Sequence, residues 1–144
     1  MTQINAPEQT RRNQVILVAE DDPDLRRLIS ETLTRDGFKV LQAQNGEVAL
    51  SVARKHQGNI DLLFTDVQMP ALDGFDLQER FQQEQSQAKL LVISGALPRN
   101  VRGVDFPLLR KPFLPSELSA KVREILGAKT IHTTGSNFGF VFTP

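Results

Sequence analysis

An apolar run over residues 62–64, followed by Thr65, leads into Asp66, and Pro70 ends the segment a few residues later. A short apolar run between turn-forming residues is typical of a buried parallel strand. Ligands bind at the carboxyl ends of the strands in open α/β sheets, so Asp66 stands where chemistry is expected. An Asp that only caps a loop is the alternative, because Asp is a common turn residue, and this segment alone does not separate the two.

Polar groups follow three other apolar runs. Glu20–Asp22 comes after residues 15–19, Ser94 after residues 90–93 and Lys111 after the run that begins at residue 106. Carboxylates about 4 Å apart repel by about 4 kcal/mol at an effective dielectric constant of about 20, and a divalent cation removes this cost. Oxygen ligands open to water suit Mg²⁺ rather than Zn²⁺. With the Lys and the hydroxyl added, the pocket suits a phosphoryl group, with Asp66 as the nucleophile of aspartyl-phosphate chemistry.

Alternating strands and helices would bring these groups together. Strands are predicted at residues 15–19, 38–41, 62–66, 90–93 and 106–109. Helices are predicted after the caps Asp22 (with Pro23 next), Asn45, Asp73 and Ser116, and Gly37, Gly58 and Gly127 are expected to end three of them. The alternation predicts an α/β fold of (βα)5 type, with a doubly wound parallel sheet covered on both faces.

Composition limits the classes of protein that fit. The chain has 144 residues, which suits one domain, with 40% hydrophobic and 24% charged residues. Lys plus Arg and Asp plus Glu each number 17, so bulk charge gives no reason to expect a nucleic-acid partner. The absence of Cys excludes disulfides and thiol chemistry. Without a signal peptide or a membrane-spanning run, a cytoplasmic location is expected. We divide the chain into a flexible leader (1–13), one domain (14–127) and a tail (128–144).

The motifs together resemble a known family. Residues 16–23 (ILVAEDDP) carry the acidic pair, residues 66–74 (DVQMPALDG) surround the central Asp, Ser94 precedes Gly95, and residues 111–113 read KPF. In this order and at strand ends, they are similar to the receiver domain of two-component response regulators, the CheY-like family. The resemblance spans Val15 to Leu126. It implies the flavodoxin-like strand order 2-1-3-4-5.

The resemblance also implies a role for each matching residue. Asp66 would accept a phosphoryl group from a histidine kinase or a histidine phosphotransfer protein. Asp21 and Asp66, Glu20 through water, and the backbone carbonyl of Gln68 would hold Mg²⁺. The protein would then be a phosphoacceptor in a phosphorelay that signals to a downstream protein, and not an enzyme in the usual sense.

On the opposite side of Asp66, Lys111 would pair with the phosphoryl oxygens, and Ser94 would donate a hydrogen bond to them. The Lys111–Pro112 peptide bond is expected to be cis, which an X-Pro bond makes inexpensive. Asp22 is kept as a helix cap.

The chain departs from the family in three places. Residues 95–110 are fewer than usual between Ser94 and Lys111, so a short or irregular fourth helix is expected there. Leu108 stands where the family often has an aromatic residue, which predicts an altered conformational switch. No output domain is expected after Gly127. Residues 128–144 are interpreted either as a disordered tail or as a docking segment, because Phe138, Phe140 and Phe142 alternate like a strand that could lie on its own sheet edge or on a partner.

Other classes of protein remain as alternatives. A metal-dependent phosphatase would place its nucleophile after the first strand, and Asp22 and Asp24 have the required spacing, but Pro23 disturbs the geometry. A nucleotide or flavin module would need a Gly-rich phosphate loop in place of the acidic loop. A degenerate receiver used only for docking, independently of phosphorylation, is a third alternative; the presence of all key residues argues against it, and only the altered fourth helix supports it.

Overall fold

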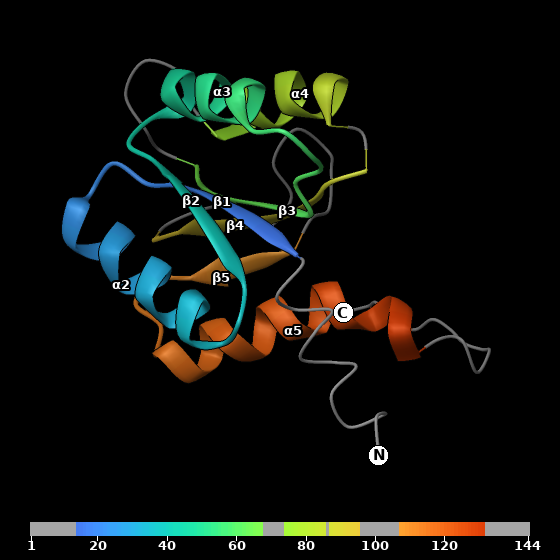
Figure 1. Cartoon of the computed structure of the whole chain (residues 1–144). Coiled ribbons are helices and arrows are strands. Elements are labelled where there is room, and N and C mark those ends of the chain that lie inside the picture. Colours follow the sequence, from blue (N-terminus) through green and yellow to red (C-terminus); the bar gives the residue numbers. More distant parts are fainter. Residues whose placement is uncertain (1–13, 68–73, 86, 96–106, 132–144) are drawn as a thin grey trace.

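Five parallel strands form the sheet of this protein, in the order β2-β1-β3-β4-β5 that the family resemblance implied (Figure 1). The computed structural model describes residues 14–67, 74–85, 87–95 and 107–131. The strands are β1 Val15–Ala19, β2 Lys39–Ala43, β3 Leu62–Asp66, β4 Lys89–Ser94 and β5 Leu108–Arg110. The helices are α2 Pro23–Arg35, α3 Gly46–Lys55, α4 Gly74–Glu84 and α5 Pro115–Ile131. The predicted α/β doubly wound fold is therefore confirmed.

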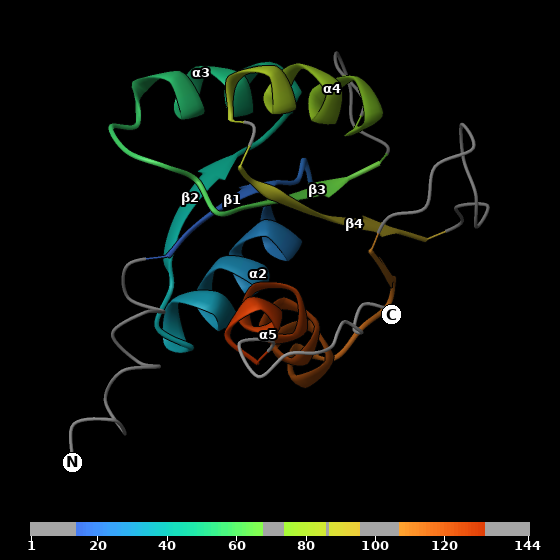
Figure 2. The same ribbon diagram turned by 90° about the vertical axis from the view of Figure 1, so that its right-hand side faces the viewer.

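Helices cover both faces of the sheet, α3 and α4 on one face and α2 and α5 on the other (Figures 1 and 2). Because side chains alternate along a strand, Leu17 and Leu63 enter the core under α3 and α4, whereas Ile16 and Leu62 enter the core beside α2 and α5. All four are at most 1% exposed. Strands buried on both faces explain why the sequence shows continuous apolar runs rather than alternation.

The caps that begin the first two helices are those read from the sequence. Asp22 accepts hydrogen bonds from the amides of Asp24 and Leu25 at the start of α2, with Pro23 as its first residue. Asn45 accepts one from Val48 at the start of α3, at 2.8 Å. After α2, Gly37 has a φ of 106°, a conformation that glycine adopts without strain.

The last helix and the last strand differ from the prediction. α5 begins at Pro115, one residue before the predicted cap Ser116, because Pro suits the first helical position and Glu117 accepts a hydrogen bond from the Leu114 amide at 2.8 Å. The helix continues through Gly127 to Ile131. Among the described residues, a Cβ atom added at position 127 would have no neighbour within 4 Å, so Gly127 is not required there by a close contact. β5 covers residues 108–110, so it includes Arg110 and leaves out Pro107, both contrary to the predicted strand 106–109.

Some expectations lie outside the described residues. These are the leader at residues 1–13, the fourth helix between β4 and β5, Phe106, the Gln68 carbonyl and the Phe-rich tail beyond residue 131. Within the part of the chain that the structure describes, every helix is too short or too polar to cross a membrane.

Candidate functional site

The parallel pairing of the strands brings the predicted site residues to one edge of the sheet. Ala19 at the end of β1 pairs with Thr65 in β3, and Asp66 pairs with Ile93 in β4. Ser94 in turn pairs with Arg110 in β5. The residues at or just past these strand ends, Glu20, Asp66, Ser94 and Lys111, therefore share the carboxyl edge, where ligands bind in this class of fold.

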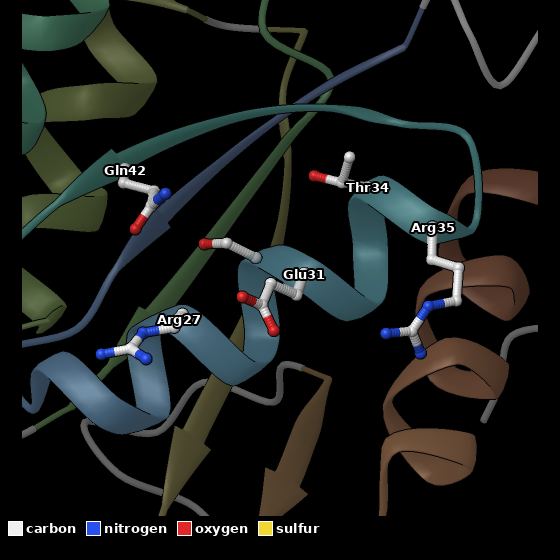
Figure 3. A pocket seen from close by; sticks show the side chains of 6 residues that line it. Arg27, Glu31, Thr34, Arg35 and Gln42 are labelled. Carbon is white, nitrogen blue, oxygen red and sulfur yellow. The ribbon is translucent and has the colours of Figure 1, made fainter.

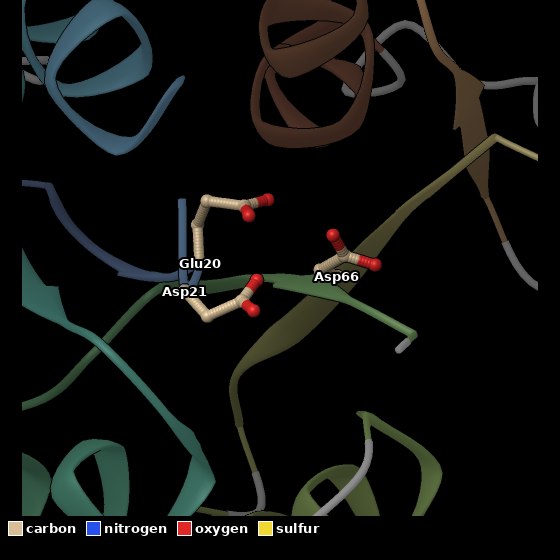
Figure 4. Close-up of side chains that lie close together, drawn as sticks. All are labelled: Glu20, Asp21 and Asp66. Carbon is tan, nitrogen blue, oxygen red and sulfur yellow. The ribbon is translucent and has the colours of Figure 1, made fainter. Parts of the chain in front are cut away.

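Three carboxylates meet at this edge. Glu20 and Asp21 extend from the end of β1 toward Asp66 at the end of β3 (Figure 4). Each contributes an oxygen atom, and these three oxygens lie within 4.8 Å of one another. Glu20 and Asp66 are buried, whereas Asp21 is exposed. The cluster is therefore open to solvent on the Asp21 side.

Lys111 provides the positive charge. Its Nζ lies 2.5 Å from Asp66 Oδ2 and 3.7 Å from Glu20 Oε1. The backbone holds the residue in place, since the Lys111 amide donates to the carbonyl oxygen of Ser94 at 3.0 Å, and the Lys111–Pro112 bond is cis as expected. Ser94 itself is 3% exposed at the end of β4. The structure thus brings Asp66, Lys111 and Ser94 together from three strands.

The electrostatics of the cluster follow from burial. Burial is the main cause that raises the pKa of Glu20 from 4.5 to about 8, and the charge of Asp66 acts in the same direction. For Lys111, burial disfavours the charge, but the hydrogen bond to Asp66 and the charges of Glu20, Asp66 and Asp21 outweigh it and raise the pKa of this amine. In the absence of a metal ion, burial therefore favours the protonated form of Glu20.

The donor set fits a small hard cation. Oε1 of Glu20 is buried and accepts no hydrogen bond from the described part of the chain. Such an orphaned buried oxygen is costly unless another group satisfies it. Carboxylate oxygens only, partly open to water, are the ligands that Mg²⁺ uses in proteins. The residues present therefore fit the predicted Mg²⁺ site, although the Gln68 carbonyl lies outside the described residues.

One residue near the cluster was not predicted from the sequence. Arg26 in α2 donates from Nη1 to the backbone carbonyl of Glu20 at 2.8 Å. The only available signal was its position in the first turn after the cap Asp22, which turns a long polar side chain back toward the acidic loop. In the same loop, the Asp22 amide donates to Glu20 Oε2 at 2.9 Å.

A second hollow lies away from the cluster. A cavity of about 440 Å³ lies between α2 and β2, with its lining formed by Arg27, Ser30, Glu31, Thr34, Arg35 and Gln42. The two guanidinium groups lie at opposite ends, with the Glu31 carboxylate between them (Figure 3). These charged groups do not converge on one point, so the acidic cluster is the better candidate site.

Comparison with known proteins identifies the class. The sequence matches the response regulator receiver domain family over residues 16–123. The chain therefore belongs to this family, and it is a receiver domain of a two-component response regulator. The resemblance read from the sequence motifs is confirmed.

Curated relatives point to the same family. The chain is 38% identical over 115 residues to the transcriptional regulatory protein CpxR of Klebsiella pneumoniae, covering 77% of this chain and 48% of that protein. It is 33% identical over 119 residues to the probable transcriptional regulator ycf27 of Pyropia yezoensis, covering 80% of this chain and 48% of the relative. The chain thus spans about half the length of these relatives.

Solved structures share the fold. The receiver domain of the hybrid histidine kinase CckA is similar with a TM-score of 0.68 and 34% identity, covering 78% of this chain and 98% of that one. The response regulator TrrA from Thermotoga maritima, in complex with Mg²⁺ and BeF, is similar with a TM-score of 0.67 and 29% identity. The match covers 78% of this chain and 99% of the TrrA chain.

Proposed function

We propose that this receiver domain is a cytoplasmic, Mg²⁺-dependent phosphoacceptor and that Asp66 takes the phosphoryl group from a phosphohistidine. The donor would be a histidine kinase or a histidine phosphotransfer protein. The observation that carries the proposal is the placement of the Asp66 carboxylate, which is buried at a strand end between Lys111 and two further carboxylates. A buried Asp with only a structural role needs no such surroundings.

In the reaction, a carboxylate oxygen of Asp66 attacks the phosphorus atom of the phosphohistidine. The new P–O bond forms while the P–N bond breaks, and the imidazole nitrogen leaves with the bonding electrons. The product is an acyl phosphate on Asp66 and a free histidine. Charge develops on the phosphoryl oxygens, so groups that neutralise it in place accelerate the transfer.

The neighbouring residues have separate roles in this transfer. Lys111 releases Asp66 and pairs with the phosphoryl oxygens, and Ser94 donates a hydrogen bond to them. Asp21, Asp66 and the Gln68 carbonyl would hold Mg²⁺, with Glu20 acting through water. When bound, Mg²⁺ supplies positive charge to the phosphoryl oxygens. This assignment makes the chain a phosphoacceptor that assists its own phosphorylation and dephosphorylation.

The phosphoryl group would switch a surface that a downstream protein recognises. Leu108, at the position where the family often has an aromatic residue, is half-buried and packs against the pair Val67 and Val92. Val67 directly follows Asp66 in the chain. We therefore propose that the signal passes from Asp66 to β5 through this small apolar cluster rather than through an aromatic side chain.

Intact-mass measurement tests the phosphoacceptor assignment. The protein is incubated with acetyl phosphate, in Mg²⁺ or in chelator, beside Asp66→Asn. One added phosphoryl group, seen only with Mg²⁺ and absent in the variant, is the expected result. If acetyl phosphate and a purified phosphotransfer protein both leave the mass unchanged, the proposal is wrong and a docking module that works without phosphorylation takes its place.

A further inference from the structure

Arg26 connects helix α2 to the acidic loop. Its side chain is half-buried, and Nη1 donates a hydrogen bond of 2.8 Å to the carbonyl oxygen of Glu20, six residues earlier in the chain. Its own amide donates to the carbonyl of Asp22 at 2.8 Å as part of α2. The guanidinium group therefore ties the rigid first turn of a helix to the residue that precedes Asp21.

This bond completes the fixation of Glu20. The strand β1 ends at Ala19, and the Glu20 amide still donates to the Ala43 carbonyl of β2 at 3.0 Å. The Glu20 carboxylate accepts from the amide of Asp22 at 2.9 Å. With Arg26 on the carbonyl, the amide, the carbonyl and the side chain of Glu20 are all held. The backbone on both sides of Asp21 is therefore held, at Glu20 by Arg26 and at Asp22 by the Glu20 carboxylate.

Arg26 also brings a positive charge to the backbone of this loop. A nearby cation by itself would weaken the binding of Mg²⁺ through repulsion. A residue that orders metal ligands strengthens binding, and removal of such outer partners typically weakens metal affinity by about 10- to 100-fold. The two effects have opposite signs, so a measurement of Mg²⁺ affinity separates them.

We propose that Arg26 is a positioning residue of the Mg²⁺ site, which orders the Glu20–Asp22 loop so that the Asp21 carboxylate faces Asp66. The proposal rests on the proposed function insofar as it takes this cluster to be the Mg²⁺ site. Ordering outweighs charge repulsion, because the guanidinium group contacts the loop backbone directly at 2.8 Å.

The test compares Arg26→Met with a matched control, Arg27→Met. Both variants remove one positive charge from the same turn of α2. The Arg27 side chain is 68% exposed and forms only a long 3.8 Å ion pair with Asp24 among the interactions described for it. Arg26→Lys keeps the charge and one hydrogen-bond donor, and it also serves if Arg26→Met fails to fold by circular dichroism.

The first measurement is amide hydrogen exchange by NMR without Mg²⁺. We expect the Asp22 amide to exchange about fivefold faster in Arg26→Met, because loss of the clamp lowers the cost of local opening. Arg27→Met should exchange like the wild type. Equal exchange in all three proteins would overturn the positioning role, whatever the protein does with phosphate.

The second measurement is calorimetric titration with MgCl₂. We expect Arg26→Met to bind Mg²⁺ about tenfold more weakly, Arg26→Lys to fall between it and the wild type, and Arg27→Met to be unchanged. Unchanged or tighter binding in Arg26→Met would contradict the proposal.

Neither measurement requires phosphorylation. A wild-type protein that binds Mg²⁺ but accepts no phosphoryl group would therefore refute the proposed function and leave the role of Arg26 intact. Conversely, normal phosphorylation with equal Mg²⁺ affinity in wild type and Arg26→Met would refute the role of Arg26 alone.

Discussion

At the scale of single residues, the burial of Glu20 opposes the ionisation of its carboxyl group. Its side chain is completely buried, and burial raises its pKa from 4.5 to about 8. Lys111 offsets only part of this cost from 3.7 Å. A divalent cation would lower the cost of ionising the buried Glu20 carboxyl group, because a bound cation favours the charged carboxylate. If the cluster binds Mg²⁺ as proposed, proton release from Glu20 would accompany metal binding.

This pKa shift predicts a pH dependence of stability for the protein in chelator. Between about pH 4.5 and pH 8, folded Glu20 keeps a proton that the unfolded chain has released. The folded state then binds more protons, so the free energy of unfolding falls as the pH rises through this window. Glu20→Gln, which stays neutral, should remove this part of the slope. At about pH 8 it should be more stable than the wild type, by up to a few kcal/mol.

Urea unfolding followed by far-UV circular dichroism measures this effect, since the chain has no Trp or Tyr to report by fluorescence. Both proteins are compared at several pH values in chelator, so that the contributions of all other carboxylates cancel. Parallel curves for wild type and Glu20→Gln would show that Glu20 is already ionised in the folded protein.

At the scale of elements, a bidentate ion pair joins α3 to α4 on one face of the sheet. Arg54 donates to Glu84 through Nη2 at 2.8 Å and through Nε at 3.1 and 3.2 Å. The hydrogen bond from Arg54 is the main cause that lowers the pKa of Glu84. Solvent screens the pair, because the Arg54 side chain is 59% exposed, so its contribution to stability is small.

The direction of this pKa shift predicts the pH range in which the ion pair stabilises the folded protein. The folded pKa of Glu84 lies below 4.5, so the stabilisation is present above pH 4.5 and is lost as the pH falls through the folded value. A double-mutant cycle of Arg54→Met and Glu84→Gln by urea unfolding should therefore give a coupling free energy at about pH 7 that is smaller at about pH 3. A coupling of equal size at both pH values would mean that packing of the side chains, not charge, links the helices.

At the scale of the whole molecule, the acidic cluster exists only in the folded chain. Glu20 and Asp21 come from the end of β1, whereas Asp66 comes from β3, and the unfolded chain has no means to hold them within 4.8 Å. A ligand that binds only the folded state stabilises it by mass action. If the cluster binds Mg²⁺ as proposed, binding would therefore stabilise the folded protein.

Accordingly, we expect the melting temperature to rise with Mg²⁺ concentration. At a concentration of about 100 times the dissociation constant, the added stability is about 2.7 kcal/mol. Asp21→Asn should abolish most of the increase, and it should leave the fold intact because Asp21 is exposed. Thermal scans at constant ionic strength measure the melting temperatures of the wild type and of Asp21→Asn as the Mg²⁺ concentration rises. A rise of the same size in the variant would show that Mg²⁺ acts elsewhere on the protein.

The sequence alone determined the local elements of this protein and the candidate residues at their ends. Continuous apolar runs marked β1 and the first three residues of β3, because a strand covered on both faces buries successive side chains. Asp22 and Asn45 marked the starts of α2 and α3, because a cap acts on amides two or three residues away. Each of these sequence patterns lies within a few residues of the strand or the helix start that it predicts.

Only the tertiary structure decided which of these residues meet and how they are held. Contact between Lys111 and Asp66 depends on strand pairing and crossovers over 45 residues, which no local pattern encodes. The bond from Arg26 to the Glu20 carbonyl depends on how α2 packs beside β1. Likewise, α5 continues through Gly127 to Ile131, although glycine is typical of the end of a helix. Local propensities are small free energies, and the packing of the whole chain decides between them.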